Sequence, residues 1–378
     1  MDKKSFLYLI LLLNQIVFTN SSLSLPIHYV TNPQQNIPFL SFVQIFPLKI
    51  NQYRMPAITM SIGTPPQSFE FLITTYSSKM YIPKHNGFDC EASSTCEDSG
   101  KEIPLRFIGE KTKGRLVKDI VTVEQVTVNK FNFVNIIDDD ITYIYKGMIG
   151  FDYLCLNEDR DIQNPVRYSF LSEIYGRGYI EKQMFSVGKI EGAPKIILGG
   201  VPENDLSFRK FKKCKLIQRK SDGSYSNLWK CTLNSIYFDD YTMYPVNEPI
   251  AFGISSNFMS VTLDFFNFLK DKYFKKPIEE GVCRVNIDEN SRALFCLNDF
   301  DTSYIGTISL VIGKINIKLS GEQLWISNSR LREKYLSLMY YEEKKFTWSI
   351  NYNIIQNQYT MVFNRQDDVF GLLVNENN

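Results

Sequence analysis

The chain has 378 residues, of which 44% are hydrophobic and 22% charged, and its 42 basic and 41 acidic residues give a net charge of +1. This ordinary composition excludes a collagen, a coiled coil and a wholly disordered chain, and the balanced charge argues against nucleic-acid binding. Because only two histidines are present, a histidine metal site or a serine–histidine relay is nearly excluded, and we expect neither a metal nor a cofactor.

The N-terminus has the pattern of a secretory signal peptide, which we place at residues 1–24. Lys3 and Lys4 precede an apolar run over residues 6–13, and small residues up to Ser24 offer cleavage positions. The alternative is a membrane anchor, but the run is shorter than the ~20 apolar residues that a span requires. We therefore expect a protein of the secretory pathway or the extracellular space, with no membrane span after cleavage.

Most of the remaining chain has the pattern of short strands. Such patterns lie at residues 58–62, 69–73, 119–128, 307–311 and 314–319. The last two flank Ile312-Gly313, which predicts a tight hairpin. Helical periodicity is confined to residues 168–179 and 263–273. The sequence therefore predicts an all-β fold of sandwiched or barrel-like sheets.

A faint internal duplication divides the chain in two. Residues 73–82 and residues 251–260 each contain apolar residues, a short turn, two adjacent serines and a mostly apolar exit. Repeats at this spacing indicate two similar lobes. We place the N-terminal lobe at residues 25–200 and the C-terminal lobe at residues 201–378.

Seven cysteines in a chain with a secretory signal predict disulfides and one leftover thiol. Their short spacings favour three local pairs, which are Cys90–Cys96, Cys214–Cys231 and Cys283–Cys296. The sequence does not fix this connectivity. Cys155 is the odd residue, for which we favour a buried free thiol over a bridge to another chain.

Ordered motifs along the chain match one known family. They are Ile62-Gly63-Thr64-Pro65-Pro66-Gln67, Gly147-Met148-Ile149-Gly150-Phe151, Ile196-Ile197-Leu198-Gly199-Gly200, Leu233-Asn234-Ser235-Ile236 after Trp229, and residues 348–372. Together they cover residues 55–373 and resemble the pepsin-family (A1) aspartic proteases. The resemblance implies a bilobal pepsin-like fold, in which two related β-barrel-like lobes enclose a cleft.

The resemblance also identifies the positions at which that family carries out catalysis. One Asp-Thr/Ser-Gly triad per lobe supplies a carboxylate, and the two carboxylates share one proton. The corresponding triads in this chain are Thr74-Thr75-Tyr76 and Phe252-Gly253-Ile254. Neither Thr74 nor Phe252 can act as a general base near neutral pH. The resemblance therefore implies a degenerate dyad, no catalytic residue and a pseudoprotease.

Further departures surround the two triads. Phe107 stands at the position of the family's flap tyrosine, and Asn351 replaces a glycine behind the second triad. Tyr76 and Ile254 place bulk where the family has the triad glycines. The residues expected to line the cleft are Thr75, Tyr76, Ser77, Phe107, Gly109, Gly253, Ile254 and Ser255.

Two charged stretches have competing interpretations. The basic residues within 209–215 could bind an acidic glycan, a lipid surface or an acidic partner. We favour the alternative, a charged strand that discourages pairing between sheet edges. For the acidic run at residues 138–140 we favour a solvated loop over a metal site.

From these observations we expect a secreted, monomeric and catalytically inactive pepsin-like protein. It would bind a peptide, a glycan or a protein partner through its cleft or its surface, because a fold alone does not supply a function. Two alternatives remain open. One is an active aspartic-type endopeptidase with atypical catalytic residues, and the other is a structural or cell-surface scaffold whose cleft is filled by side chains.

Overall fold

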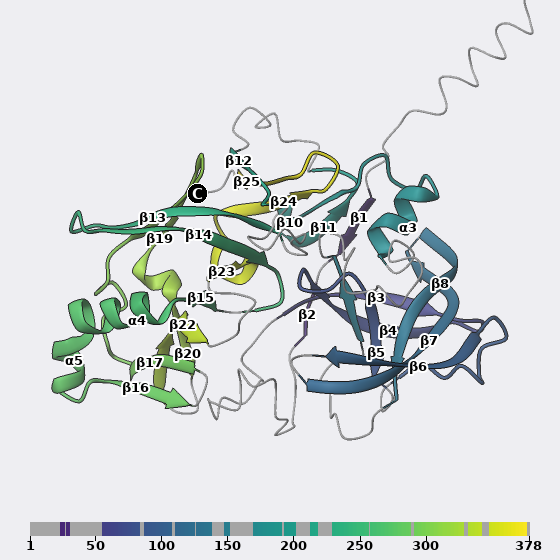
Figure 1. Ribbon diagram of the computed structural model, residues 1–378, viewed down its shortest axis with the longest axis horizontal. Helices are drawn as coiled ribbons and strands as arrows, with labels where there is room; N and C mark the ends of the chain where they lie inside the picture. The colour runs from purple at the N-terminus through teal and green to yellow at the C-terminus, as the bar shows by residue number, and fades with distance from the viewer. Residues whose placement is uncertain are drawn as a thin grey trace, which may run out of the picture.

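The computed structural model describes most of the chain between residues 23 and 375 (Figure 1). The described ranges are 23–26, 28–30, 55–83, 87–107, 110–124, 126–137, 147–151, 169–190, 193–201, 212–217, 229–256, 258–288, 291–328, 332–341 and 348–375. Several sequence predictions lie outside them: the signal sequence up to residue 22, Gly109, the acidic run at 138–140, Cys155 and the start of the basic stretch.

The first half of the chain builds an eight-stranded sheet with the order β2-β3-β4-β9-β5-β8-β7-β6. Its elements are β2 (His28–Val30), β3 (Met55–Ile62), β4 (Gln67–Thr74), β5 (Met80–Pro83), β6 (Glu97–Phe107), β7 (Glu110–Val123), β8 (Val126–Ile136), β9 (Gly147–Gly150) and the following helix α3 (Phe170–Gly176). The stretch at residues 119–128 is therefore two strands, not the single strand expected, because the chain turns at Glu124 with a φ of 47°.

The second half builds an 11-stranded sheet, shown at the left of Figure 1. Its strands are β13 (Lys230–Phe238), β14 (Met243–Gly253), β15 (Met259–Val261), β16 (Cys283–Asp288), β17 (Ser291–Leu297), β18 (Ile308–Ile312), β19 (Ile315–Leu319), β20 (Trp325–Asn328), β21 (Glu333–Leu336), β22 (Leu338–Tyr341) and β23 (Trp348–Asn351). Its helical segments are α4 (Leu263–Leu269), η5 (Lys270–Phe274), α5 (Lys275–Glu279), η6 (Gly321–Leu324) and α6 (Tyr352–Ile355).

A third sheet joins the two halves, with the order β1-β11-β10-β24-β25-β12. Its strands are β1 (Leu23–Pro26), β10 (Met184–Ile190), β11 (Ala193–Leu198), β12 (Lys212–Lys215), β24 (Tyr359–Asn364) and β25 (Val369–Val374). The predicted division at residue 200 puts three of these strands on each side. Two lobes that share a central sheet confirm the predicted all-β, bilobal architecture.

Local sequence explains the elements that were predicted. In β19 the residues alternate between buried and exposed, as expected for a strand with one face on the core. The two-residue turn before it contains Gly313, whose φ of 58° suits a glycine. Thr262 caps α4 by accepting a hydrogen bond from Phe265 N. The helix expected over residues 263–273 continues beyond α4 as the π-helical turn η5.

Large aromatic side chains form the core between the lobes. Phe185 of β10 stacks on Phe363 of β24 with ring centroids 4.5 Å apart, and Trp229 packs against both rings. The Trp229 indole also donates a hydrogen bond of 2.9 Å to Phe151 O of the first half. Because these groups come from both halves of the chain, the core fixes the lobes relative to one another.

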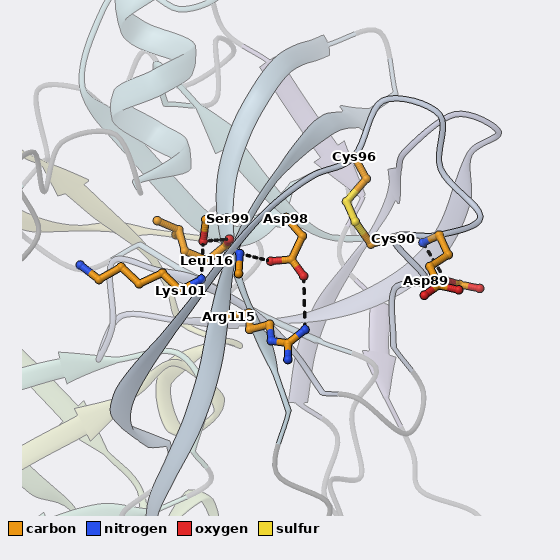
Figure 2. A network of polar contacts seen from close by, with 10 residues as sticks. Asp89, Cys90, Cys96, Asp98, Ser99, Lys101, Arg115 and Leu116 are labelled. Carbon is orange, nitrogen blue, oxygen red and sulfur yellow. Dashed lines mark hydrogen bonds and ion pairs between the residues drawn. A yellow bond between two sulfur atoms is a disulfide. The ribbon is translucent and has the colours of Figure 1, made fainter.

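The outer edge of the eight-stranded sheet is protected by an irregularity in β6 (Figure 2). The register with β7 shifts after Asp98, whose carboxylate accepts from Gly100 N and pairs with Arg115 at 3.5 Å. Ser99 Oγ donates to Leu116 O at 2.7 Å. A bulged, charged edge of this kind does not offer a regular ladder to another strand.

Two observations concern the predicted signal peptide and the predicted lack of a membrane span. The predicted end of the signal peptide at Ser24 falls inside β1, where Ser24 pairs with Ile197 of β11. None of the helices in the described part of the chain is long and apolar enough to cross a membrane.

The three predicted disulfides are all present, namely Cys90–Cys96, Cys214–Cys231 and Cys283–Cys296. Figure 2 shows the first beside the base of β6. The second joins β12 to β13 and therefore connects the shared sheet to the second lobe.

Removing the bridge between β12 and β13 should destabilise the protein measurably. The cysteines are 17 residues apart. A bridge that closes a loop of that length lowers the entropy of the unfolded chain and so stabilises the folded state by about 3 kcal/mol. We expect a Cys214→Ala, Cys231→Ala variant to lose about that free energy of unfolding in urea titrations. An unchanged midpoint would contradict a stabilising role for the bridge.

Candidate functional site

Two loops meet at the centre of the molecule, one from each lobe. β4 ends at Thr74, which pairs with Gly150 in the parallel neighbour β9. β14 ends at Gly253, which pairs with Asn351 in the parallel neighbour β23. The strands that leave the loops pair in the same way, since Tyr81 faces Met148 and Ser260 faces Ser349. Thr74 and Gly253 therefore occupy corresponding positions in the two lobes.

This correspondence corrects the predicted alignment of the second lobe by one residue. Phe252, expected opposite Thr74, instead corresponds to Ile73, and both side chains are buried in the interior. The Phe252 ring stacks on Phe370 of β25 with centroids 3.5 Å apart. Successive residues of a strand point to opposite faces, so a one-residue error exchanges an interior residue for a site residue.

The corrected triads are Thr74-Thr75-Tyr76 and Gly253-Ile254-Ser255. The middle residues, Thr75 and Ile254, are both fully buried. Thr75 Oγ1 donates a hydrogen bond of 3.0 Å to Phe252 O of the other lobe. Ile254 has no hydroxyl with which to return this bond. Ile254 was expected to add bulk at the turn, but that position belongs to Ser255.

The third residue of each triad reaches the first position of the other lobe. Tyr76 Oη donates to Asn351 Oδ1 at 3.1 Å, beside Gly253. Ser255 Oγ donates to Thr74 Oγ1 at 3.2 Å. We call these four side chains, Thr74, Tyr76, Ser255 and Asn351, the interlobe junction.

The junction fills the space that a side chain on Gly253 would need. A Cβ built on Gly253 would lie 2.0 Å from Asn351 Oδ1 and 2.1 Å from Tyr76 Oη. Asn351 is itself held in place, because it is fully buried and its Nδ2 donates to Phe258 O at 2.7 Å. The site therefore has no room for a carboxylate at position 253 unless these neighbours move.

The hydrogen bonds described at the junction join hydroxyl, amide and main-chain groups. Thr74 Oγ1 also accepts from Tyr76 N at 3.1 Å. Glu248, the acid closest in sequence to the second triad, accepts a bond of 2.7 Å from the Trp348 indole. Hydroxyls and amides do not ionise near neutral pH, so these groups provide no general base.

The other predicted cleft residues are only partly brought to the junction. Ser77 Oγ donates to Tyr81 Oη at 3.3 Å and accepts from Lys79 N. Phe107 ends β6 and pairs through its main chain with Glu110, the first residue of β7. Within the described residues, no group of three or more His, Cys, Asp or Glu side chains is placed to hold a metal ion.

The sequence matches a known protein family, and the fold matches a solved structure. The family model for eukaryotic aspartyl proteases matches residues 56–373. An aspartic proteinase from Irpex lacteus shares the fold with a TM-score of 0.68, at 13% identity, over 94% of this chain and 98% of its own.

Curated relatives match over shorter stretches. Gastricsin of Cavia porcellus is 28% identical over 162 residues, which cover 38% of this chain and 40% of the relative. Cathepsin E-B of Xenopus laevis is 31% identical over 108 residues, which cover 25% and 27%. Vacuolar protease A of Neurospora crassa is 23% identical and covers 38% of each chain. The matches thus span about a quarter to two-fifths of these relatives.

Proposed function

Because the chain belongs to the eukaryotic aspartyl protease family, we propose that it is a member that does not hydrolyse peptide bonds. In this proposal its retained fold binds a partner, which is a peptide, a glycan or another protein. The observation that carries the proposal is the interlobe junction, in which Tyr76 and Asn351 occupy the space beside Gly253.

The chemistry of the family explains why this substitution matters. Two adjacent carboxylates cannot both ionise, so one acts as a base on water while the other, protonated, polarises the scissile carbonyl. Thr74 and Gly253 stand at the two corresponding positions, and neither can accept a proton from water near neutral pH. Tyr76 and Asn351 also occupy the space that a side chain at position 253 would need.

The filled junction also favours a second candidate function, that of a structural or cell-surface scaffold. Tyr76 bonds to Asn351 and Ser255 bonds to Thr74, so both contacts cross between the lobes. Contacts of this kind stabilise a fixed arrangement of the lobes. In either case we place the protein in the secretory pathway, because its three disulfides suit an oxidising compartment.

The proposal is tested by assaying the purified chain for proteolysis. We expect no cleavage of an unfolded protein substrate between about pH 3 and 7, a range whose acidic part, below about pH 5, is where a carboxylate pair shares one proton. Gastricsin, assayed in parallel, provides the positive control. Hydrolysis that pepstatin inhibits would refute the proposal and establish the chain as an active endopeptidase with atypical residues.

A further inference from the structure

A group of lysines lies where the edges of two sheets meet. β12 is the outer strand of the shared sheet, and β19 is the outer strand of the 11-stranded sheet (Figure 1). The two edges are in contact. A Cβ on Gly313, in the turn before β19, would lie 3.7 Å from Cys214 Cβ of β12. The bridge from Cys214 to Cys231 holds β12 in this place.

Five exposed lysines lie on these two edge strands and in the turn before β19, and we call them the lysine seam. They are Lys212, Lys213 and Lys215 on β12, Lys314 in the turn, and Lys318 on β19. Within the described ranges, none of the five makes an ion pair. Lysines elsewhere differ: Lys113, Lys130 and Lys276 pair with glutamates at 3.8, 2.8 and 3.7 Å.

Protection of a sheet edge accounts for part of this arrangement, in line with the prediction made for the basic residues within 209–215. A lysine on an edge strand discourages pairing with another chain. That explanation applies to β12 and β19 separately, and one or two charges on each strand would be enough. It does not explain why the edges of two different sheets bring the β12 lysines and Lys314 close together, since like charges repel one another.

We propose that the lysine seam binds a linear polyanion of the sulfated polysaccharide class. Binding would relieve the mutual repulsion of the lysines and release the counterions condensed on the polymer. Lysine suits this ligand because its ammonium is a compact charge on a flexible stem that can follow irregularly spaced sulfates. The disulfide and the two sheets provide a rigid support, so little ordering is required on binding.

The surroundings of the seam favour a polysaccharide over an anionic membrane. The three disulfides indicate an oxidising compartment, whereas anionic lipids are concentrated in the cytoplasmic leaflet.

The test measures binding of the full chain to heparin by titration at several salt concentrations. We expect affinity to fall steeply with salt, and replacement of all five seam lysines by alanine to weaken binding by about 100-fold or more. The three β12 substitutions alone should weaken it by about tenfold. Unchanged far-UV circular dichroism and thermal midpoint would show that these variants are folded.

A matched control removes three lysines outside the seam. The Lys113→Ala, Lys130→Ala, Lys276→Ala variant loses the same charge as the β12 variant and should bind heparin like the wild type. An equal loss in the control would overturn the proposal, because net charge alone would then explain binding. It is also overturned if the wild type does not bind heparin, or if it binds only phosphatidylserine vesicles. None of these outcomes depends on protease activity.

Discussion

Replacing Phe252 with alanine is expected to lower the free energy of unfolding by about 3–5 kcal/mol. The ring is 1% exposed and stacks on Phe370, which itself contacts Phe363 in the aromatic core between the lobes. Truncation would remove these contacts and leave a cavity that a rigid three-sheet core cannot collapse around. Urea unfolding followed by tryptophan fluorescence measures the loss.

A matched control for Phe252 comes from the neighbouring strand. Tyr237 of β13 is 42% exposed, and Tyr237→Ala should change stability by no more than about 0.5 kcal/mol. If Phe252 instead stood at the dyad position and faced an open cleft, its replacement would be equally mild. The experiment therefore tests the one-residue correction independently of any activity.

Replacing Gly253 with alanine is expected to cost about 1–3 kcal/mol, because the new methyl group would overlap its neighbours. It would lie 2.0 Å from Asn351 Oδ1 and 2.1 Å from Tyr76 Oη, and Asn351 is buried and hydrogen-bonded. The penalty should largely disappear when Tyr76 and Asn351 are both alanine, since the overlapping atoms are then absent. A thermodynamic cycle of the four variants gives this coupling.

Gly176 provides the control for this substitution. A Cβ built there meets no atom within 4 Å, and Gly176 does not have a positive φ. Gly176→Ala should therefore change stability by no more than about 0.5 kcal/mol. A Gly253→Ala variant as stable as the wild type, or a penalty that persists without Tyr76 and Asn351, would contradict the filled junction. The same overlap implies that an aspartate at 253 cannot be introduced alone.

Much of the fold was predictable because its signals are local. Alternating apolar and polar residues marked β19 in the sequence, and Gly313 marked the turn of its hairpin. Short spacing favoured the three disulfides that are present, although their settings differ. Cys90 and Cys96 lie in one loop, Cys283 and Cys296 on paired strands, and Cys214 and Cys231 on strands of different sheets. Thr74, the first residue of the first triad, ends β4, in the register that the motif at residues 62–67 and the serines after the triad indicated.

The second triad was misplaced because its signals are weaker. Gly253 is small, like the second residue of the family's triad, which is Thr or Ser. The alignment therefore placed Gly253 second and Phe252 first, where the family has Asp. The parallel ladder with β23 decides the register, and it depends on a strand almost 100 residues further along the chain. One signal in the sequence could have indicated the correct register, namely that a small residue at one position accompanies large residues at two others. The side chain missing at Gly253 is balanced by those gained at Tyr76 and Asn351, where the family has glycines.

The sequence by itself determined the family, the two-lobed plan and the lack of an acidic residue in either triad, because each depends only on which residue types occur and in which order. Only the tertiary structure decided whether the vacated centre is open or occupied. Tyr76 and Asn351 are 275 residues apart and meet because the core joins the lobes in one arrangement. Packing across lobes depends on distances between distant segments, which no local pattern encodes.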